Sequence, residues 1–408
     1  MGKVDFMSLN LNKQNAVYFP GETLTGSVNY KISERLKINK VKLIAIGEGC
    51  VRWTETHGSG KDRSTRTYTG YEKYFFIEIN LVAKQSNNDL YLECGEYAHP
   101  FQILLPPMLP TSFEHYDASI RYKLVATIDI PWAFDKHSTR TFTVLSQNDL
   151  NKNVGLKQPY VMNESKTLCC LCCQSDPITV TLTLKQSKCM HYFYFSFSFF
   201  KFCFLDSISS LIELVILFYF FKNNFLCDLC WAAGFVPGEA ICFDLVVDNK
   251  SNRDIKPPLA SLVQCVRLQA TTKSKTTFRK VATFELPNRI QERMCEKFDN
   301  MKLLVPPICS SSFGTSRIID ISYYFDLNFD ASGPSISTDL KIPVVIGTMP
   351  LRSSQDDSHP QSSSHAILTY EASIFDANQF KQELIDKGEI MQSDADTYKP
   401  FYPYYKNF

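Results

Sequence analysis

The chain has 408 residues, a formal net charge of +1 at pH 7, and 44% hydrophobic and 13% aromatic residues. This length exceeds one hydrophobic core of ordinary size, so we expect two or three domains. The apolar content excludes a mainly disordered chain, and the balanced charge excludes a general attraction to nucleic acid. The N-terminal residues lack the apolar stretch of a secretory signal, so we expect a cytosolic protein whose fourteen cysteines are reduced.

Strict alternation of apolar and polar residues is the dominant pattern along the chain, and it predicts half-buried antiparallel strands. It is strict over residues 120–130 and 321–329, and less clean over residues 24–32, 41–45, 180–184 and 241–247. Pro-Gly pairs at 20–21 and 237–238 predict tight turns, because proline fixes φ and glycine accepts a positive φ. No convincing helical period precedes residue 370, so we predict an all-β chain built from sandwiches.

Basic residues gather in two places, a hairpin-like loop near residue 63 and a Thr-rich strand or loop near residue 275. The candidate cargo- or phosphate-binding residues are Lys61, Arg63, Arg66, Lys273, Lys275 and Arg279. Alternate residues share one face of a strand, so the second group predicts a cationic stripe for phosphate, acidic cargo or anionic lipid. A solvated face without a ligand explains the same pattern.

Four cysteines, Cys169, Cys170, Cys172 and Cys173, form the cluster CCLCC. A zinc site normally needs two C-x-x-C pairs separated by a loop of roughly 12 to 20 residues, whereas the two C-x-x-C pairs of this cluster interleave. Three interpretations stay open: small structural side chains in a linker or strand edge, palmitoylation that anchors the chain to a membrane, and metal binding.

An aromatic segment, residues 189–231, fits no sandwich. Leu11 and Pro20 are 9 positions apart, whereas Leu184 and Pro237 are 53 apart, so about 44 residues lack a counterpart. We interpret the segment as a retained intron translated in frame; a genuine insertion loop and a membrane span over residues 202–221 are the alternatives. A single span would place strands of one sheet on opposite sides of the bilayer, which argues against it.

Beyond Met349 the chain becomes rich in Ser, Gln and Asp, which predicts a disordered tail. Residues 398–405, close to its end, read YKPFYPYY, an aromatic sequence.

Two stretches of the chain repeat in the same order. FPGETLTGSVNY corresponds to FVPGEAICFDLVVDN, and LLPPMLPTSFEHYDASIRYKLVATI to LLVPPICSSSFGTSRIIDISYYFDLNF. These residues resemble the arrestin domain-containing proteins, or α-arrestins. The resemblance implies two tandem immunoglobulin-like β-sandwiches: an N-domain over 1–150, a linker over 151–176 with the Cys cluster, a C-domain over 177–347 interrupted by 189–231, and a flexible tail over 348–408.

The resemblance also implies a function: a cytosolic adaptor, recruited to the plasma membrane and endosomes, that links membrane receptors or transporters to endocytosis and ubiquitination. α-Arrestin tails usually carry PPxY motifs for the WW domains of HECT ubiquitin ligases. This chain has none, and its nearest candidate docking motif is Pro400, Tyr402, Pro403 and Tyr405.

Catalytic motifs such as GxSxG, HExxH and the phosphate-binding loop are missing from the sequence, so we expect neither an enzyme nor a cofactor. The alternative functions are a single-pass or membrane-anchored protein that uses residues 202–221, and a secreted adhesion module with glycans on Asn163 and Asn249.

Overall fold

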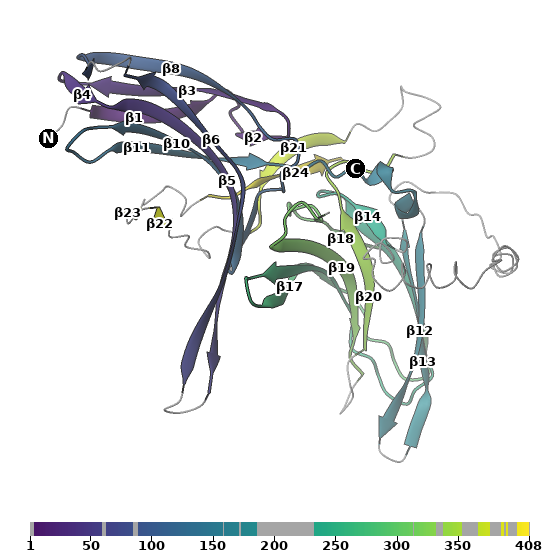
Figure 1. The fold of residues 1–408 in the computed structure, drawn as a ribbon. Coiled ribbons are helices and arrows are strands. Elements are labelled where there is room, and N and C mark those ends of the chain that lie inside the picture. Colours follow the sequence, from purple (N-terminus) through teal and green to yellow (C-terminus); the bar gives the residue numbers. More distant parts are fainter. Residues whose placement is uncertain are drawn as a thin grey trace, which may run out of the picture.

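The computed structural model describes residues 4–58, 63–84, 89–157, 159–170, 173–185, 232–312, 314–331, 338–352, 366–375, 385–386, 389–390 and 398–407. They form two β-sandwiches that meet at an angle (Figure 1). The aromatic segment 189–231, including the candidate span 202–221, lies outside the described residues.

The N-terminal sandwich consists of two sheets. One has the order β1-β3-β8, with β1 at Val4–Leu11, β3 at Thr23–Ile32 and β8 at Gly95–Leu104. The other has the order β2-β11-β10-β5-β6, and β9 pairs with β10. Its strands are β2 (Val17–Tyr18), β5 (Lys40–His57), β6 (Ser64–Ala83), β9 (Phe113–His115), β10 (Ala118–Asp129) and β11 (Lys136–Val144). A small pair, β4 (Leu36–Ile38) with β7 (Leu90–Leu92), closes one end.

The C-terminal sandwich repeats this plan with one extra strand. Its first sheet has the order β12-β13-β15-β18 and its second the order β14-β20-β19-β16-β17. The first sheet contains β12 (Tyr160–Cys170), β13 (Cys173–Lys185), β15 (Ala240–Asn249) and β18 (Cys295–Leu304). The second contains β14 (Ala233–Phe235), β16 (Leu259–Gln269), β17 (Ser274–Glu285), β19 (Ile319–Phe329) and β20 (Thr338–Ile346).

The two halves share their strand order once β12 is left out. In both, a short strand pairs in parallel with its neighbour: β2 with β11, and β14 with β20. The repeated Pro-Gly turns also have the same geometry. Gly21 has φ 78° and Gly238 has φ 91°. Each donates its N–H to a backbone carbonyl just after the last strand of the first sheet: Gly21 to Pro106 O at 3.0 Å after β8, and Gly238 to Val305 O at 2.8 Å after β18. Positive φ is cheap only for glycine, so the repeated sequence encodes the repeated turn.

The glutamate after each glycine completes the turn. Glu22 Oε2 accepts a hydrogen bond from the N–H of Phe19 at 3.0 Å, and Glu239 Oε2 accepts one from Val236 at 3.1 Å. The PGE sequence is therefore repeated because all three residues fix the same turn in both sandwiches. The predicted duplication of one sandwich is confirmed.

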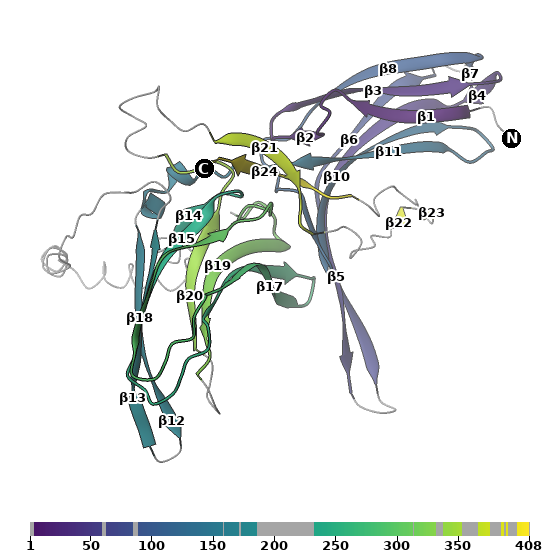
Figure 2. The ribbon, with the colours of Figure 1, turned by 180° about the vertical axis from the view of Figure 1, so that it is seen from behind.

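The stretch expected to be a linker, residues 151–176, contains two short 3₁₀ turns, Leu150–Lys152 and Val154–Lys157, and the strand β12. β12 pairs with β13, and the two form a long hairpin. The β12–β13 and β5–β6 hairpins extend toward the same side of the molecule in both views (Figures 1 and 2).

The predicted tail contains two strands of the main body. β21 (Ile367–Ala372) pairs with β24 (Phe401–Lys406), and together they lie over the junction of the two sandwiches (Figure 1). We call residues 366–375 and 398–407 the C-terminal strap. For these segments the prediction of a disordered tail is wrong, because their apolar side chains find a surface that only the assembled sandwiches provide. A further small pair joins β22 (Ile385–Asp386) to β23 (Glu389–Ile390).

Candidate functional site: the domain junction and the C-terminal strap

The predicted cationic stripe lies at the junction between the sandwiches. Lys273 forms an ion pair with Glu55, and Lys275 forms one with Asp117, both at 2.5 Å. The hydrogen bond with Lys273 lowers the pKa of Glu55. Both ammonium groups are thus paired with carboxylates of the N-terminal sandwich, so this face of β17 contacts the N-terminal sandwich. The hypothesis that these lysines bind cargo is untested, and their geometry does not favour it.

Arg279, the third member of the stripe, also points into the junction. Its Nη2 donates to Gln264 Oε1 at 2.7 Å, and its guanidinium lies over the ring of Phe375 in the C-terminal strap. Burial lowers the pKa of Arg279 to about 10, and no described carboxylate forms an ion pair with it. The strap therefore covers a partly desolvated cation, an arrangement favoured by the cation–π attraction.

His115 links β9 to β17 across the same junction. Its Nδ1 accepts the N–H of Asp117 at 3.2 Å, so the ring proton is on Nε2, which is 3.2 Å from Thr277 Oγ1. Burial, followed by the charges of Arg279 and Lys275, lowers the pKa of His115 to about 3. The ring is consequently neutral at physiological pH and makes a neutral interdomain hydrogen bond.

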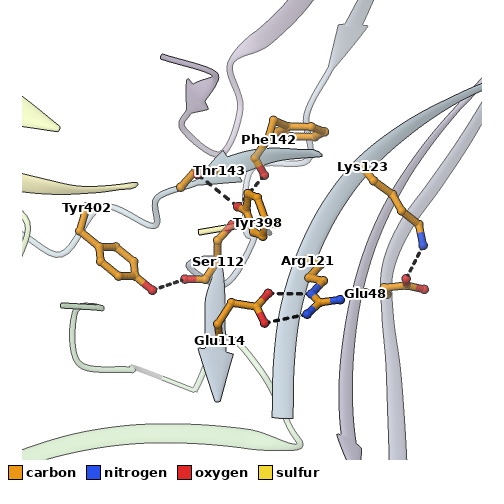
Figure 3. A network of polar contacts seen from close by, with 9 residues as sticks. All are labelled: Glu48, Ser112, Glu114, Arg121, Lys123, Phe142, Thr143, Tyr398 and Tyr402. Atoms are coloured by element: carbon orange, nitrogen blue, oxygen red, sulfur yellow. Dashed lines mark hydrogen bonds and ion pairs between the residues drawn. The ribbon is translucent and has the colours of Figure 1, made fainter. Parts of the chain in front are cut away.

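Two buried ion pairs lie on β10 (Figure 3). Arg121 donates to both carboxylate oxygens of Glu114 at 2.6 and 2.8 Å, and Lys123 Nζ lies 2.8 Å from Glu48 Oε1. The sequence predicted a half-buried strand with Arg121 and Lys123 on a polar face, and this was wrong. β10 is the middle strand of its sheet and is buried on both faces, so its cations need carboxylate partners. Burial raises the pKa of Glu114 to about 7.

Tyrosine hydroxyls attach the strap to both sandwiches. Tyr402 is 2% exposed, and its hydroxyl donates to the carbonyl of Ser112 at 2.9 Å (Figure 3). Tyr398 donates to the carbonyl of Phe142 at 3.1 Å. On the C-terminal sandwich, the hydroxyl of Tyr405 donates to Thr348 O at 2.8 Å. The strap thus holds the two domains in one relative position.

The candidate docking motif lies inside the strap. Pro400, Tyr402, Pro403 and Tyr405 are all buried. A WW domain binds a proline segment in an exposed, extended form, so the motif is not presented in this conformation. Its role as a docking motif is untested. The aromatic-rich composition of FYPYYK, which favours strands, is the sequence signal that could have indicated a strand here.

The other predicted site residues that the structure describes lie near the ends of the two projecting hairpins. Arg63 and Arg66 are exposed near the tip of the β5–β6 hairpin, and Lys61 lies outside the described residues. Within the Cys cluster, Cys170 and Cys173 are cross-strand backbone neighbours at the end of the β12–β13 hairpin. Cys169 precedes them on β12, and Cys172 lies outside the described part. Cys169, Cys170 and Cys173 therefore belong to a hairpin end of the second sandwich.

Three alternatives raised by the sequence are a glycan on Asn249, a membrane span and a metal site. Asn249 is 0% exposed and its amide donates to two backbone carbonyls, so it cannot carry a glycan in this fold. Among the described residues, no helix is long and apolar enough to span a membrane, and no three His, Cys, Asp or Glu side chains are grouped to hold a metal ion.

Comparison with known families identifies both sandwiches. Residues 7–151 match the N-terminal domain of arrestin (or S-antigen), and residues 232–351 match the arrestin C-terminal domain. With the duplicated fold, these matches show that the chain belongs to the arrestin family. Its members are generally non-catalytic adaptors.

The relatives that the chain matches are arrestin domain-containing proteins. Arrestin domain-containing protein 17 of Caenorhabditis elegans is 31% identical over 183 residues, which is 43% of this chain and 42% of the relative. Human arrestin domain-containing protein 1 is 25% identical over 86% of this chain and 66% of the relative. Human arrestin domain-containing protein 4 is 24% identical over 83% of this chain and 70% of the relative. The chain thus spans less than two thirds of the length of the first two.

Proposed function

We propose that this chain is a non-catalytic, cytosolic adaptor of the α-arrestin type that is recruited to the plasma membrane and endosomes. It would bind cytoplasmic tails of receptors or transporters and link them to endocytic sorting and ubiquitination. The observation that carries the proposal is the pair of arrestin domains, joined by interdomain ion pairs and by the strap. Such a joined body offers sheet edges and projecting hairpins as binding surfaces.

The contrast between the two basic groups favours one cargo surface. Lys273 and Lys275 are paired with carboxylates, whereas Arg63 and Arg66 are exposed at a hairpin tip and form no ion pair within the described residues. An acidic or phosphorylated tail would therefore bind the β5–β6 tip, where guanidinium groups can engage phosphate with two hydrogen bonds each.

Peptides from the cytoplasmic tails of receptors and transporters, in phosphorylated and unphosphorylated forms, test this surface by titration calorimetry. Arg63→Glu/Arg66→Glu should weaken binding about tenfold or more, because it replaces attraction by repulsion. Arg140→Glu/Lys302→Glu makes the same change in net charge on other exposed strand positions and should leave affinity within about twofold. If no tail peptide binds the intact chain, the adaptor proposal fails.

The buried motif bears on ubiquitin ligase recruitment. WW-domain binding through Pro400 and Tyr402 requires that β24 leaves the junction, so the intact chain should bind isolated WW domains of HECT ligases weakly or not at all. A Gly238→Ala variant, in which the added Cβ would meet the backbone of Tyr405 and loosen the strap, keeps the motif intact and should bind them more tightly if the motif is functional. No gain in that variant would restrict ligase recruitment to other segments.

Palmitoylation of Cys169, Cys170, Cys172 or Cys173 is a further part of the proposal, tested by hydroxylamine-sensitive labelling.

A further inference from the structure

The loop between β10 and β11 has two aromatic side chains fully in solvent. Trp132 is 104% exposed and Phe134 is 80% exposed, the two highest values among exposed aromatic residues of the described chain. The loop lies at the end of the N-terminal sandwich that is remote from the C-terminal sandwich and the strap (Figures 1 and 2). Neither the domain junction nor the fold of the sandwich uses these rings.

The backbone of this loop holds Trp132 in its exposed position. The N–H of Ala133 donates to the carbonyl of Ile130, with Pro131 and Trp132 between them, and Trp132 has φ 65°. A proline followed by a residue of positive φ is the pattern of a type II turn, whose third position glycine normally fills. Here a tryptophan occupies the position at which a large side chain is disfavoured. Asp135 Oδ1 accepts the N–H of Ile130 at 3.1 Å and closes the base of the loop.

We propose that residues 130–135 are a membrane-contacting loop whose Trp132 and Phe134 rings insert into the interfacial region of a lipid bilayer. Two observations favour lipid over a protein pocket. The rings protrude from a convex turn, and none of the described chain shelters Trp132 or forms a rim around it. A fluid surface accommodates such a tip without shape complementarity, and tryptophan prefers the bilayer interface, where its ring is apolar and its N–H meets polar groups.

Other aromatic groups lie at the same end of the sandwich. Tyr91 on β7 is 40% exposed and has the guanidinium of Arg35 4.2 Å from its ring centroid. Figure 2 shows β7 and the β10–β11 loop at this end. An orientation with this end on the membrane leaves the β5–β6 tip and the strap free. The inference deepens the proposed function, because an adaptor for membrane proteins works beside a bilayer.

Co-sedimentation of the full chain with phosphatidylcholine vesicles, with and without phosphatidylserine, tests the loop. Trp132→Gly/Phe134→Ser should lower the vesicle-bound fraction about tenfold, since binding scales with buried apolar area. Glycine suits the turn, so the variant should keep the thermal stability of the parent chain. Leu104→Ser/Met108→Ser removes apolar area that is 67% and 83% exposed outside the loop, and should change partitioning less than about twofold.

Brominated lipids give a direct readout, because they quench tryptophan only on contact. The parent chain should show quenching that a Trp132→Phe variant loses, although Trp53 and Trp231 remain. Unchanged partitioning of the loop variant, or equal quenching in both chains, would overturn the inference. The loop variant should still bind tail peptides in solution without vesicles. Loss of peptide binding by all chains would therefore refute the adaptor proposal and leave the lipid result intact.

Discussion

Truncation of Tyr402 should open the C-terminal strap. The ring belongs to the main hydrophobic core, is 2% exposed, and donates its hydroxyl to Ser112 O at 2.9 Å. Replacing a buried aromatic ring by alanine costs about 3 to 5 kcal/mol. Since 1.4 kcal/mol corresponds to a factor of ten, the open population of the strap should rise by about a hundredfold to a few thousandfold.

Native-state hydrogen exchange at β21 measures this change, because β21 is paired with β24 from Ile367 to Ala372. The Tyr402→Ala variant should lose amide protection at β21 by the same factor, while β16 and β19 in the sandwich core keep theirs. Tyr402→Phe removes only the hydroxyl and should cost about 1 kcal/mol, or roughly a fivefold loss of protection.

Tyr404, the half-buried tyrosine between Tyr402 and Tyr405 on the same strand, supplies the control. Tyr404→Ala should reduce protection at β21 much less, because a smaller part of its ring leaves water on folding. Equal exchange in the Tyr402→Ala variant and the parent chain, or equal losses in both alanine variants, would show that Tyr402 does not hold the strap.

Three further predictions concern the junction. His115 is neutral in the folded chain because burial lowers its pKa from 6.5 to about 3. The stability that it contributes is therefore complete above pH 6.5 and falls as the pH drops toward 3, with a loss of about 2 kcal/mol at about pH 5. Chemical denaturation above pH 6.5 and at about pH 5 measures this loss of unfolding free energy. The loss should be smaller in His115→Gln than in the parent chain, and an equal loss in both would contradict the prediction. Gly238→Ala should loosen the strap by about 1 kcal/mol or more, because its φ is 91° and the added Cβ would meet the backbone of β24. Gly314→Ala is the control: its φ is 70° but the added Cβ meets nothing, so it measures the backbone strain without the clash. Asp117→Lys should weaken the coupling between the domains, because it breaks the ion pair with Lys275. Adding Lys275→Asp restores a pair of opposite charges and should recover about 1 kcal/mol in a double-mutant cycle of thermal stability. Strictly additive effects of the two substitutions would show that these side chains do not interact.

Much of the fold was predictable from local patterns. Alternation located the central strands of both sandwiches, and the glycines at 21 and 238 specified the same turn twice. These features depend on neighbouring residues alone: the side-chain period of a strand is two, and a positive φ selects glycine. The order of the repeats then sufficed to predict two copies of one sandwich.

Tertiary structure alone decided the roles of the charged and aromatic residues. Lys275 has the same local pattern whether it faces solvent or a carboxylate 158 positions away, and here it pairs with Asp117. Arg121 alternates as a surface residue would, yet the sheet around β10 buries it against Glu114. The closing YKPFYPYY suggested an exposed motif, but Tyr402 finds its partner 290 positions earlier. Burial and pairing depend on which distant strands meet, and local periodicity carries no information about that.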